Sequence, residues 1–517
     1  MYQVITTLKP ADSAGKDSVT TPFGIRTIRF DAKKGFLLNE KPLKLKGVCC
    51  HQDHAGVGTA LPDGLQEYRI RKLKEMGCNA YRSSHNPPSP ALLDACDRLG
   101  MLVMDENRQF SSAPEDLADL ESHVRRDRNH PSVILWCIGN EETAIQTQPQ
   151  ARRIARTLVQ RIHQLDPSRP VTLATTFWDT NFKPMKRLPL DAPTTSVELD
   201  VMGFNYNEDY WEPYHRQAPA HPVVITEASS NYRTRGCYES DPSQCFQAWD
   251  PRSRGGAEGQ WAQVAKAPWL SGIFLWTGFD YRGEPWPQGW PGINSNFGLM
   301  DTCGFPKDNY YFYKAWWTSA PLVHIFPHWN WPDQLGKPVT VGCYANCEEV
   351  ELLLNGHSLG RKTMEPNGHL EWKDVIYAPG ALEARGFNGG QQAASERVET
   401  TGAPASVRIA QDFIQPQPGG VMVVNVAIAD DAGRIVPTAD PLVSFQVEGP
   451  ARIIGVGNGN PSSHEPDHAP HRRAFNGYCQ VILQKAESTG SITLTATAPG
   501  LRTGKAVMSG TSTSVER

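Results

Sequence analysis

In the first part of the chain, two kinds of apolar pattern take turns, one typical of buried strands and the other of helices. From about residue 42 to residue 320, short continuous apolar runs of strand length are separated by stretches of helical periodicity. One such stretch places Ile70, Leu73 and Met76 on one helical face and ends at Gly77. The predicted strands lie at residues 43–49, 78–83, 102–105, 133–139, 171–176, 201–206, 223–227 and 273–279. Eight strand-and-helix units in roughly 275 residues predict a (β/α)8 TIM barrel.

Outside this region, apolar and polar residues alternate with a period of two, which is typical of half-buried strands. Near the N-terminus, residues 2–8 and 23–30 are predicted to form two such strands. Two strands alone do not make a stable sheet. They therefore either pack on the next domain or are the remnant of an immunoglobulin-like β-sandwich whose other strands are missing.

After residue 320 the helical signal ends, and alternating runs continue towards the C-terminus. Asn355 and Gly356 are a strong signal for a two-residue hairpin turn. The pattern predicts two further antiparallel domains, the second of immunoglobulin type. The predicted domains are a sandwich remnant at 1–38, the barrel at 39–320, a β-sandwich at 321–403 and an immunoglobulin-like β-sandwich at 404–517.

Composition narrows the class of protein. The formal net charge is −4 and the pI is near 6.4, so neither nucleic acid nor an anionic membrane is an expected partner. No apolar run approaches the roughly 20 residues that span a bilayer, and the N-terminus lacks the pattern of a signal peptide. The eleven cysteines show no metal-type spacing, so buried free thiols are expected rather than a disulfide framework or a zinc site. These features lean towards a reducing, cytoplasmic compartment.

Two of the predicted barrel strands end in carboxylates. The apolar run at 133–138 is followed by Asn140 and Glu141, and the strand predicted at 223–227 ends in Glu227. In a barrel the carboxyl ends of the strands carry the chemistry, although a solvated turn after a core strand would show the same pattern. A retaining glycosidase requires an acid/base and a nucleophile, with carboxyl groups about 5 to 5.5 Å apart. Two such strands favour a catalytic pair.

A glycine-rich motif near the C-terminus offers an alternative chemistry. Gly455, Gly457 and Gly459 follow a predicted strand, as they would in a dinucleotide-binding loop. The next residues are Asn-Pro-Ser-Ser, and no helical pattern follows to hold a pyrophosphate. No cofactor is therefore expected.

Longer motifs cover the predicted barrel in order. They are Asn-Ala-Tyr-Arg-Ser-Ser-His-Asn-Pro-Pro at 79–88, Arg-Asn-His-Pro-Ser-Val-Ile-Leu-Trp-Cys-Ile-Gly-Asn-Glu at 128–141, Gly-Phe-Asn-Tyr at 203–206, Ile-Thr-Glu at 225–227 and Leu-Trp-Thr-Gly-Phe-Asp at 275–280. In this combination the chain resembles glycoside hydrolase family 2, which contains β-galactosidases, β-glucuronidases and β-mannosidases. The strings at 276–285, 293–298 and 303–307 are similar to the β-galactosidase branch with extra C-terminal sandwich domains.

The resemblance implies a role for each residue of the expected sugar site. Glu141 would be the acid/base at the end of the fourth strand, and Glu227 would be the nucleophile at the end of the seventh. Burial and the nearby anionic Glu227 would raise the pKa of Glu141, so that Glu141 keeps its proton near neutral pH. Asn140 would bind the sugar 2-hydroxyl, and Tyr206 would support the nucleophile.

Five more residues are candidates for the sugar subsite. His51, Arg82 and His85 lie at the ends of the first two predicted strands and match polar positions of the family, although a lone histidine is more often structural. Trp276 matches the aromatic floor beneath the sugar, with a core tryptophan as the alternative. Asp53 follows His51 by two residues and is a candidate acceptor for a sugar hydroxyl.

The chain departs from the family pattern in three places. After Asp105 and Glu106 it lacks the Glu-x-His that supplies magnesium ligands in the best-known β-galactosidases, so no catalytic metal is expected. The Asn-x-Lys of β-glucuronidases, which binds the sugar carboxylate, is not apparent near residue 295. Family members normally begin with a jelly roll and a complete sandwich, so this chain is expected to be N-terminally shortened.

Together these patterns predict a retaining exo-glycosidase that hydrolyses terminal β-D-galactosides by double displacement. Another sugar of the same family remains an alternative, namely a β-glucuronide, an arabinopyranoside or a galactofuranoside. A carbohydrate-binding protein without turnover is the alternative from a different class. The expected partner is a glycoside or oligosaccharide substrate, and a homo-oligomer stays open.

Overall fold

The computed structural model describes residues 1–9, 15–146, 148–176, 195–230, 232–238, 256–486 and 490–509. The chain forms two compact units. The barrel unit comprises Met1–His51, Cys78–Ser229 and Gln263–Trp276, and the sandwich unit comprises Gln52–Gly77, Ser230–Ala262 and Thr277–Arg517.

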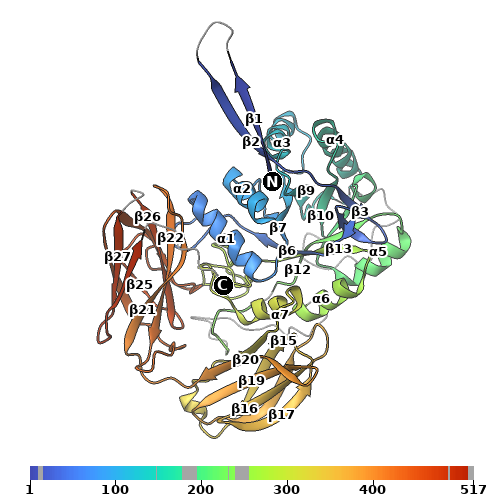
Figure 1. Cartoon of the computed structure of the whole chain (residues 1–517). Helices are drawn as coiled ribbons and strands as arrows, with labels where there is room; N and C mark the ends of the chain where they lie inside the picture. The colour runs from blue at the N-terminus through green and yellow to red at the C-terminus, as the bar shows by residue number, and fades with distance from the viewer. Residues whose placement is uncertain are drawn as a thin grey trace. The chain divides into compact units, whose positions relative to one another are not determined.

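Eight parallel strands close into a barrel within the barrel unit (Figure 1). They are β6 (Leu45–Cys50), β7 (Ala80–Ser83), β8 (Leu102–Glu106), β9 (Val133–Asn140), β10 (Val171–Thr175), β11 (Met202–Asn205), β12 (Val223–Ala228) and β13 (Leu270–Leu275). Closure occurs where β13 pairs with β6 in parallel. Nearly all residues of these strands are buried, which explains why the sequence shows continuous apolar runs. The predicted TIM barrel is confirmed.

The eighth strand was predicted about three residues too late. The apolar run at 273–279 suggested a strand there, whereas β13 ends at Leu275. The Trp276 N–H donates to Ala228 O at 2.7 Å, at the end of the neighbouring strand β12. Trp276 is therefore the first residue after the strand, at the carboxyl rim of the barrel.

Helices follow the strands of the barrel, and local sequence sets their ends. In the barrel unit α2 begins after Ser89, whose hydroxyl accepts from the Leu92 N–H at 3.3 Å, and it ends at Gly100, which has a left-handed φ of 69°. The helices are α1 (Asp63–Glu75), α2 (Pro90–Leu99), α3 (Pro114–Asp127), α4 (Pro149–Leu165), α5 (Trp211–Gln217), α6 (Ala257–Lys266) and α7 (Asp308–Trp317), with short helices η1 (Thr195–Glu198), η2 (Glu208–Tyr210) and η3 (Pro332–Gln334). The helical pattern noted in the sequence at 70–76 corresponds to the end of α1, with Met76 as its C-cap residue.

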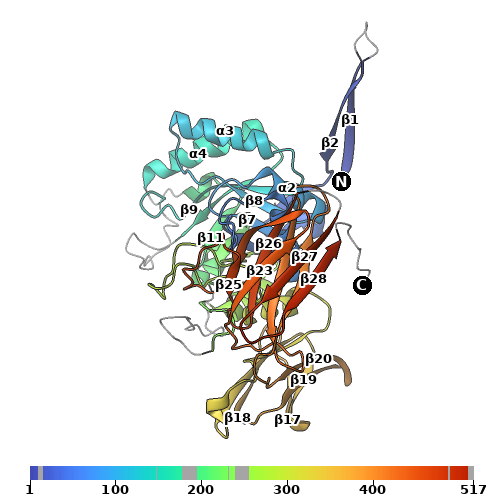
Figure 2. The same ribbon diagram turned by 90° about the vertical axis from the view of Figure 1, so that its left-hand side faces the viewer.

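The N-terminal strands form a hairpin of β1 (Tyr2–Leu8) and β2 (Asp17–Phe23), which extends away from the barrel in Figure 2. A three-stranded sheet of β3 (Ile28–Asp31), β4 (Gly35–Leu38) and β5 (Lys41–Pro42) follows. The prediction of one continuous strand at 23–30 is wrong. The Arg26 guanidinium donates to Pro131 O at 2.6 Å and to Val133 O at 2.7 Å, so the chain between β2 and β3 is bound to the barrel.

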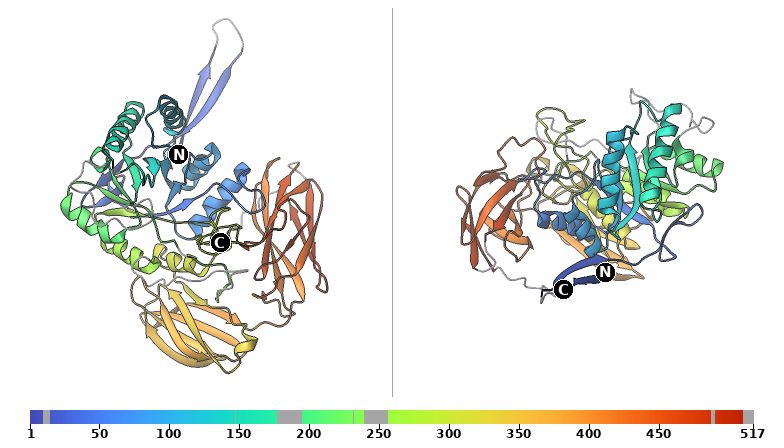
Figure 3. Two further views of the ribbon diagram at one scale, coloured as in Figure 1. Left: turned by 180° about the vertical axis from the view of Figure 1, so that it is seen from behind. Right: turned by 90° about the horizontal axis from the view of Figure 1, so that it is seen from above.

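Residues 323–399 of the sandwich unit form two facing antiparallel sheets (Figure 3). One contains β14 (Val323–Phe326), β15 (Pro338–Ala345) and β18 (Leu370–Ile376), and the other contains β16 (Glu349–Leu354), β17 (His357–Thr363), β19 (Ala381–Asn388) and β20 (Gln391–Glu399). Trp329, Trp372 and Leu382 are buried in their shared core. Asn355 and Gly356 join β16 to β17 with φ values of 52° and 82°, as a two-residue hairpin turn requires.

The last part of the sandwich unit repeats this layered arrangement. Its sheets contain β21 (Ser406–Ile414), β22 (Val421–Ala429), β24 (Ala451–Gly457) and β26 (Tyr478–Lys485), and β23 (Leu442–Glu448), β25 (His471–Arg473), β27 (Ser491–Thr497) and β28 (Gly504–Ser509). Val424, Val481 and Leu494 belong to its core. A Cβ on Gly455 would lie 2.3 Å from Gly56 O, so this glycine allows a close backbone approach.

The state of the cysteines and the length of the helices can be compared with what the composition predicted. Nine cysteines among the described residues are free and buried, as expected, and Cys237 is disulfide-bonded. Within the described ranges, every helix is too short or too polar to cross a membrane.

Candidate active site

The carboxyl ends of five barrel strands bring polar side chains to one rim. These strands are parallel, so their ends meet at the same edge of the closed sheet. The side chains are Arg82 on β7, Glu106 on β8, Asn140 on β9, Asn205 on β11 and Glu227 on β12. Glu141 directly follows the end of β9 and joins this cluster, which we call the rim cluster.

Arg82 connects the members of the rim cluster. Its side chain is completely buried, and its guanidinium donates to Glu106 Oε2 at 2.7 Å, to Glu227 Oε2 at 2.8 Å and to Asn140 Oδ1 at 2.7 Å. Burial disfavours the charged guanidinium, but the charges of Glu106 and Glu227 outweigh it and hold the pKa of Arg82 well above its usual value. Arg82 therefore stays cationic and fixes three acceptors relative to one another.

Three aromatic rings, those of His51, His85 and Trp276, contact one another next to the carboxylate of Glu106. His85 Nδ1 lies 2.8 Å from Glu106 Oε1, and its ring stacks on Trp276 with centroids 5.0 Å apart. His51 contacts both rings edge-on, at 5.7 Å from His85 and 5.4 Å from Trp276. Glu106 is fully buried; although burial raises the pKa of Glu106, Arg82 and His85 lower it overall. Glu106 thus remains ionised and orients both Arg82 and His85.

Glu141 lies in a different electrostatic environment. The Asn205 amide donates to Glu141 Oε1 at 3.2 Å and to Asn140 Oδ1 at 2.9 Å, while the Thr226 hydroxyl donates to Asn205 Oδ1 at 2.7 Å. Burial first, and then the negative charge of Glu227, raise the pKa of Glu141 to about 7. The carboxyl of Glu141 can therefore hold a proton near neutral pH and donate it.

The backbone is unusual at two of these strand ends. Glu141 and Tyr206 both have a φ of 51°, a left-handed conformation that non-glycine residues rarely adopt and that costs on the order of 1 to 3 kcal/mol. Hydrogen bonds hold both in place, from the Glu141 N–H to Ala174 O at 2.9 Å and from the Tyr206 N–H to Glu227 O at 2.6 Å. The Tyr206 backbone is thus tied to Glu227, and a role for its hydroxyl stays a prediction.

Asp53 belongs to the sandwich unit. Its Oδ2 accepts from the Arg282 N–H at 2.9 Å, and its buried Oδ1 has no hydrogen-bond partner among the described residues. Burial raises the pKa of Asp53, against the opposing charge of Arg69. A carboxylate oxygen without a partner is what a sugar ligand would need, and this role for Asp53 stays a prediction.

The sequence patterns did not single out two members of the rim cluster. Glu106 closes an apolar run on β8, as Glu141 and Glu227 do on their strands, so the same signal could have found it. Asn205 lies inside the motif at 203–206, but its importance depends on contacts with Asn140 and Glu141, sixty-five and sixty-four residues away in the chain.

Two groups of side chains in the described part of the chain have the chemistry of metal ligands. They are Asp94, Asp97 and His130, and Asp105, His123 and Asp127. Direct contacts join members of both groups, since His130 Nδ1 lies 2.7 Å from Asp97 and His123 Nε2 lies 2.8 Å from Asp105. Neither group includes Glu141 or Glu227, and the expectation of no catalytic metal stays a prediction.

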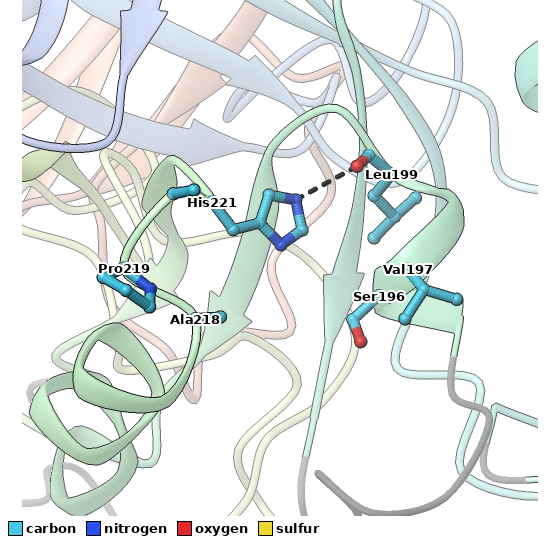
Figure 4. Close-up of a pocket in the computed structure, with 7 residues that line it drawn as sticks. Ser196, Val197, Leu199, Ala218, Pro219 and His221 are labelled. Carbon is cyan, nitrogen blue, oxygen red and sulfur yellow. Dashed lines mark hydrogen bonds between the residues drawn. The ribbon is translucent and has the colours of Figure 1, made fainter.

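The barrel unit has a pocket of about 340 Å³ (Figure 4). It lies near the opposite end of the strands from the rim cluster. It is lined by Ser196, Val197, Leu199, Ala218, Pro219, Ala220 and His221. Leu199 and His221 precede the first residues of β11 and β12, so the pocket lies near the amino ends of these strands. His221 donates from Nε2 to Leu199 O at 3.0 Å and contacts the Tyr214 hydroxyl at 2.7 Å, so it has a structural role.

Family models match most of the described domains. A model described as "Glycosyl hydrolases family 2, TIM barrel domain" matches residues 30–288. "Glycoside hydrolase family 2 C-terminal domain 5" matches residues 407–507. A domain of unknown function (DUF4982) matches residues 336–394.

Individual relatives agree with these matches. A β-galactosidase of Bacteroides ovatus, BoGH2A, is 36% identical over 571 residues, which cover 97% of this chain and 65% of the relative. A β-glucuronidase of Formosa agariphila is 26% identical over 531 residues, covering 97% of this chain and 51% of that protein. The crystal structure of a β-glycosidase from Bacteroides vulgatus superposes with a TM-score of 0.84 at 35% identity, covering 98% of this chain and 69% of the other.

The chain thus spans 65% and 51% of the lengths of these two curated relatives. The barrel match covers half of the chain, and a second family 2 match covers its last sandwich. This protein therefore belongs to glycoside hydrolase family 2.

Proposed function

We propose that this protein is a retaining exo-β-galactosidase in which Glu227 is the nucleophile and Glu141 is the acid/base. The observation that carries the proposal is the unequal environment of the two carboxyl groups within one hydrogen-bonded cluster. Glu227 accepts from the Arg82 guanidinium at 2.8 Å, whereas Glu141 has a neutral amide donor and a pKa raised to about 7. Pairs of carboxyl groups in such different environments are typical of an acid and a nucleophile.

The two residues would act in sequence. In the first step Glu227 forms a bond to the anomeric carbon as the bond to the leaving oxygen breaks, and Glu141 gives its proton to that oxygen. In the second step the Glu141 carboxylate takes a proton from water, whose oxygen attacks the anomeric carbon and releases Glu227. The Asn140 side chain, whose Oδ1 accepts from Arg82 and Asn205, would bind the sugar 2-hydroxyl.

The choice of galactose rests on two observations. The relative with 36% identity is named a β-galactosidase. In addition, the guanidinium in the described rim cluster is already paired with Glu106 and Glu227, so it offers no spare positive charge to the carboxylate of a glucuronide. β-Glucuronide is the second candidate, because relatives from Formosa agariphila and Bacteroides fragilis are named β-glucuronidases.

Hydrolysis of a panel of nitrophenyl glycosides by the purified chain tests the proposal. We expect cleavage of the β-galactoside, with NMR showing that the sugar is first released as the β-anomer. Glu227→Ala should abolish turnover while the sugar still binds. Glu141→Ala should lose most activity on alkyl galactosides and keep activity on activated aryl galactosides.

Three outcomes would contradict parts of this proposal. Preferred cleavage of the glucuronide would show that the substrate sugar is glucuronic acid and not galactose, and it would leave the proposed mechanism unchanged. Release of the α-anomer would exclude double displacement. Sugar binding with no turnover on any glycoside would identify a carbohydrate-binding protein.

A further inference from the structure

A loop of the sandwich unit, residues 282–294, is fixed in shape by its own backbone. An antiparallel bridge closes its ends, with the Gly283 N–H donating to Ile293 O at 2.9 Å. Inside the loop the Gly289 N–H donates to Pro285 O at 2.8 Å. We call this segment the tryptophan loop, because it carries Trp286 and Trp290.

The tryptophan loop is also bound to the last sandwich of the same unit. The Gln288 amide donates to the Ser462 hydroxyl at 2.8 Å, and His464 Nε2 donates to Pro291 O at 2.9 Å. The Ile293 N–H also donates a hydrogen bond to Pro461 O at 2.8 Å. A loop held at this many points presents its side chains in defined positions.

Both tryptophans of this fixed loop face solvent. Trp286 is 61% exposed and Trp290 is 81% exposed, which makes Trp290 the most exposed large hydrophobic side chain of the described residues. Each indole meets a neighbouring ring edge-on, Trp286 with Tyr232 at 5.3 Å between centroids and Trp290 with His464 at 4.8 Å. A single exposed apolar residue needs no explanation, but two oriented indoles on one rigid loop indicate a binding surface.

The surroundings of the two indoles match a sugar better than a protein. The same loop also carries the polar side chains of Arg282, Glu284 and Gln288, of which the first two are exposed. A stable protein interface buries about 800 Å² on each partner around an apolar core. A sugar ring has one apolar C–H face, which stacks on an indole, and hydroxyls at its edge, which polar neighbours can bind.

We propose that Trp286 and Trp290 form a surface that binds neutral polysaccharide, separate in its residues from the rim cluster. The inference rests on the proposed glycosidase function in one respect, the expectation that the ligand is a carbohydrate. It concerns binding, so it is tested without turnover.

Affinity gel electrophoresis of the full chain provides the test, with soluble β-1,4-galactan, glucomannan and arabinoxylan as probes. The parent is Glu227→Ala, which cannot consume the probe. At least one polysaccharide should retard the parent, and adding Trp286→Ala and Trp290→Ala should weaken the apparent affinity at least fivefold. Trp290→Phe, which keeps an aromatic face, should restore part of the retardation.

Leu335→Ala is the matched control, because Leu335 is an apolar residue of the same unit that is 65% exposed. It should leave retardation unchanged. The proposal fails if the parent is not retarded by any of the three polysaccharides, or if the tryptophan substitutions do not reduce retardation. It also fails if sedimentation shows a dimer that dissociates on these substitutions, because the loop would then bind a second copy. Hydrolysis of nitrophenyl β-galactoside by the Trp286→Ala/Trp290→Ala variant with Glu227 intact reports on the proposed function separately.

Discussion

The proton on Glu141 should set the alkaline limit of activity. The pKa of this carboxyl is raised from its ordinary value of 4.5 to about 7, by burial first and by the charge of Glu227 second. A general acid works only while protonated, so the active fraction should fall as pH rises through the raised pKa. We expect kcat/KM for an alkyl β-galactoside to be halved near pH 7 and to fall about tenfold for each further pH unit above pH 8.

The size of the effect follows from the two pKa values. With a pKa of about 7, about half of the Glu141 carboxyls hold a proton at pH 7. With the ordinary value of 4.5, roughly 0.3% would do so. The environment of the rim cluster therefore supplies about 150 times more of the protonated acid at neutral pH than an exposed glutamate would have.

The assay compares two leaving groups across pH 5 to 9. The alkaline limb is the fall of kcat/KM as pH rises above about 7. Methyl β-galactoside should show this limb, but 2,4-dinitrophenyl β-galactoside should not, because a dinitrophenolate departs without a proton. In Glu141→Ala, the limb should be absent with the dinitrophenyl substrate, and turnover of the methyl substrate should nearly vanish. The assignment of Glu141 as the acid would be refuted if kcat/KM fell at the same alkaline pH with both substrates. It would also be refuted if the alkaline limb persisted in Glu141→Ala.

Three further predictions concern the rim cluster and the barrel. Arg82→Met leaves the buried Glu106 and Glu227 without a cation and should cost about 3 to 5 kcal/mol, seen as a lower urea midpoint. Adding Glu106→Gln should recover part of this loss, and no recovery would argue against the ion pair. Asn140→Ala should lower kcat/KM about 100-fold on a β-galactoside but little on its 2-deoxy analogue, and an equal loss on both would exclude contact with the 2-hydroxyl. Gly203→Ala places a Cβ 2.4 Å from Leu173 O and should cost about 1 to 3 kcal/mol, so an unchanged melting temperature would contradict that packing.

The sequence by itself predicted the barrel, because a parallel strand covered on both faces needs an uninterrupted apolar run. The same runs located Glu141 and Glu227, since a carboxylate at the carboxyl end of a buried strand must lie at the rim. Short-range turn chemistry was equally informative at Asn355 and Gly356, where positive φ values suit those two residues. Each of these signals lies within a few residues of the feature that it predicts.

The errors arose where distant contacts overrode the local pattern. The run at 23–30 alternates like a strand, yet Arg26 binds backbone carbonyls more than a hundred residues away and interrupts it. At the eighth strand the apolar run continues past Leu275, but pairing with the neighbouring strands ends there. Periodicity records which residues are apolar and does not record where a partner strand stops.

Only the tertiary structure decided which side chains of the rim cluster contact one another. Arg82 meets Glu106, Asn140 and Glu227 across 24, 58 and 145 positions of sequence. The raised pKa of Glu141 likewise depends on burial and on the charge of Glu227, which a neighbouring part of the chain does not supply. The exposure of Trp286 and Trp290 also became visible only in the folded loop. The physical reason is that barrel closure sets the distances between side chains of different strands, whereas sequence periodicity specifies only the face on which each side chain lies.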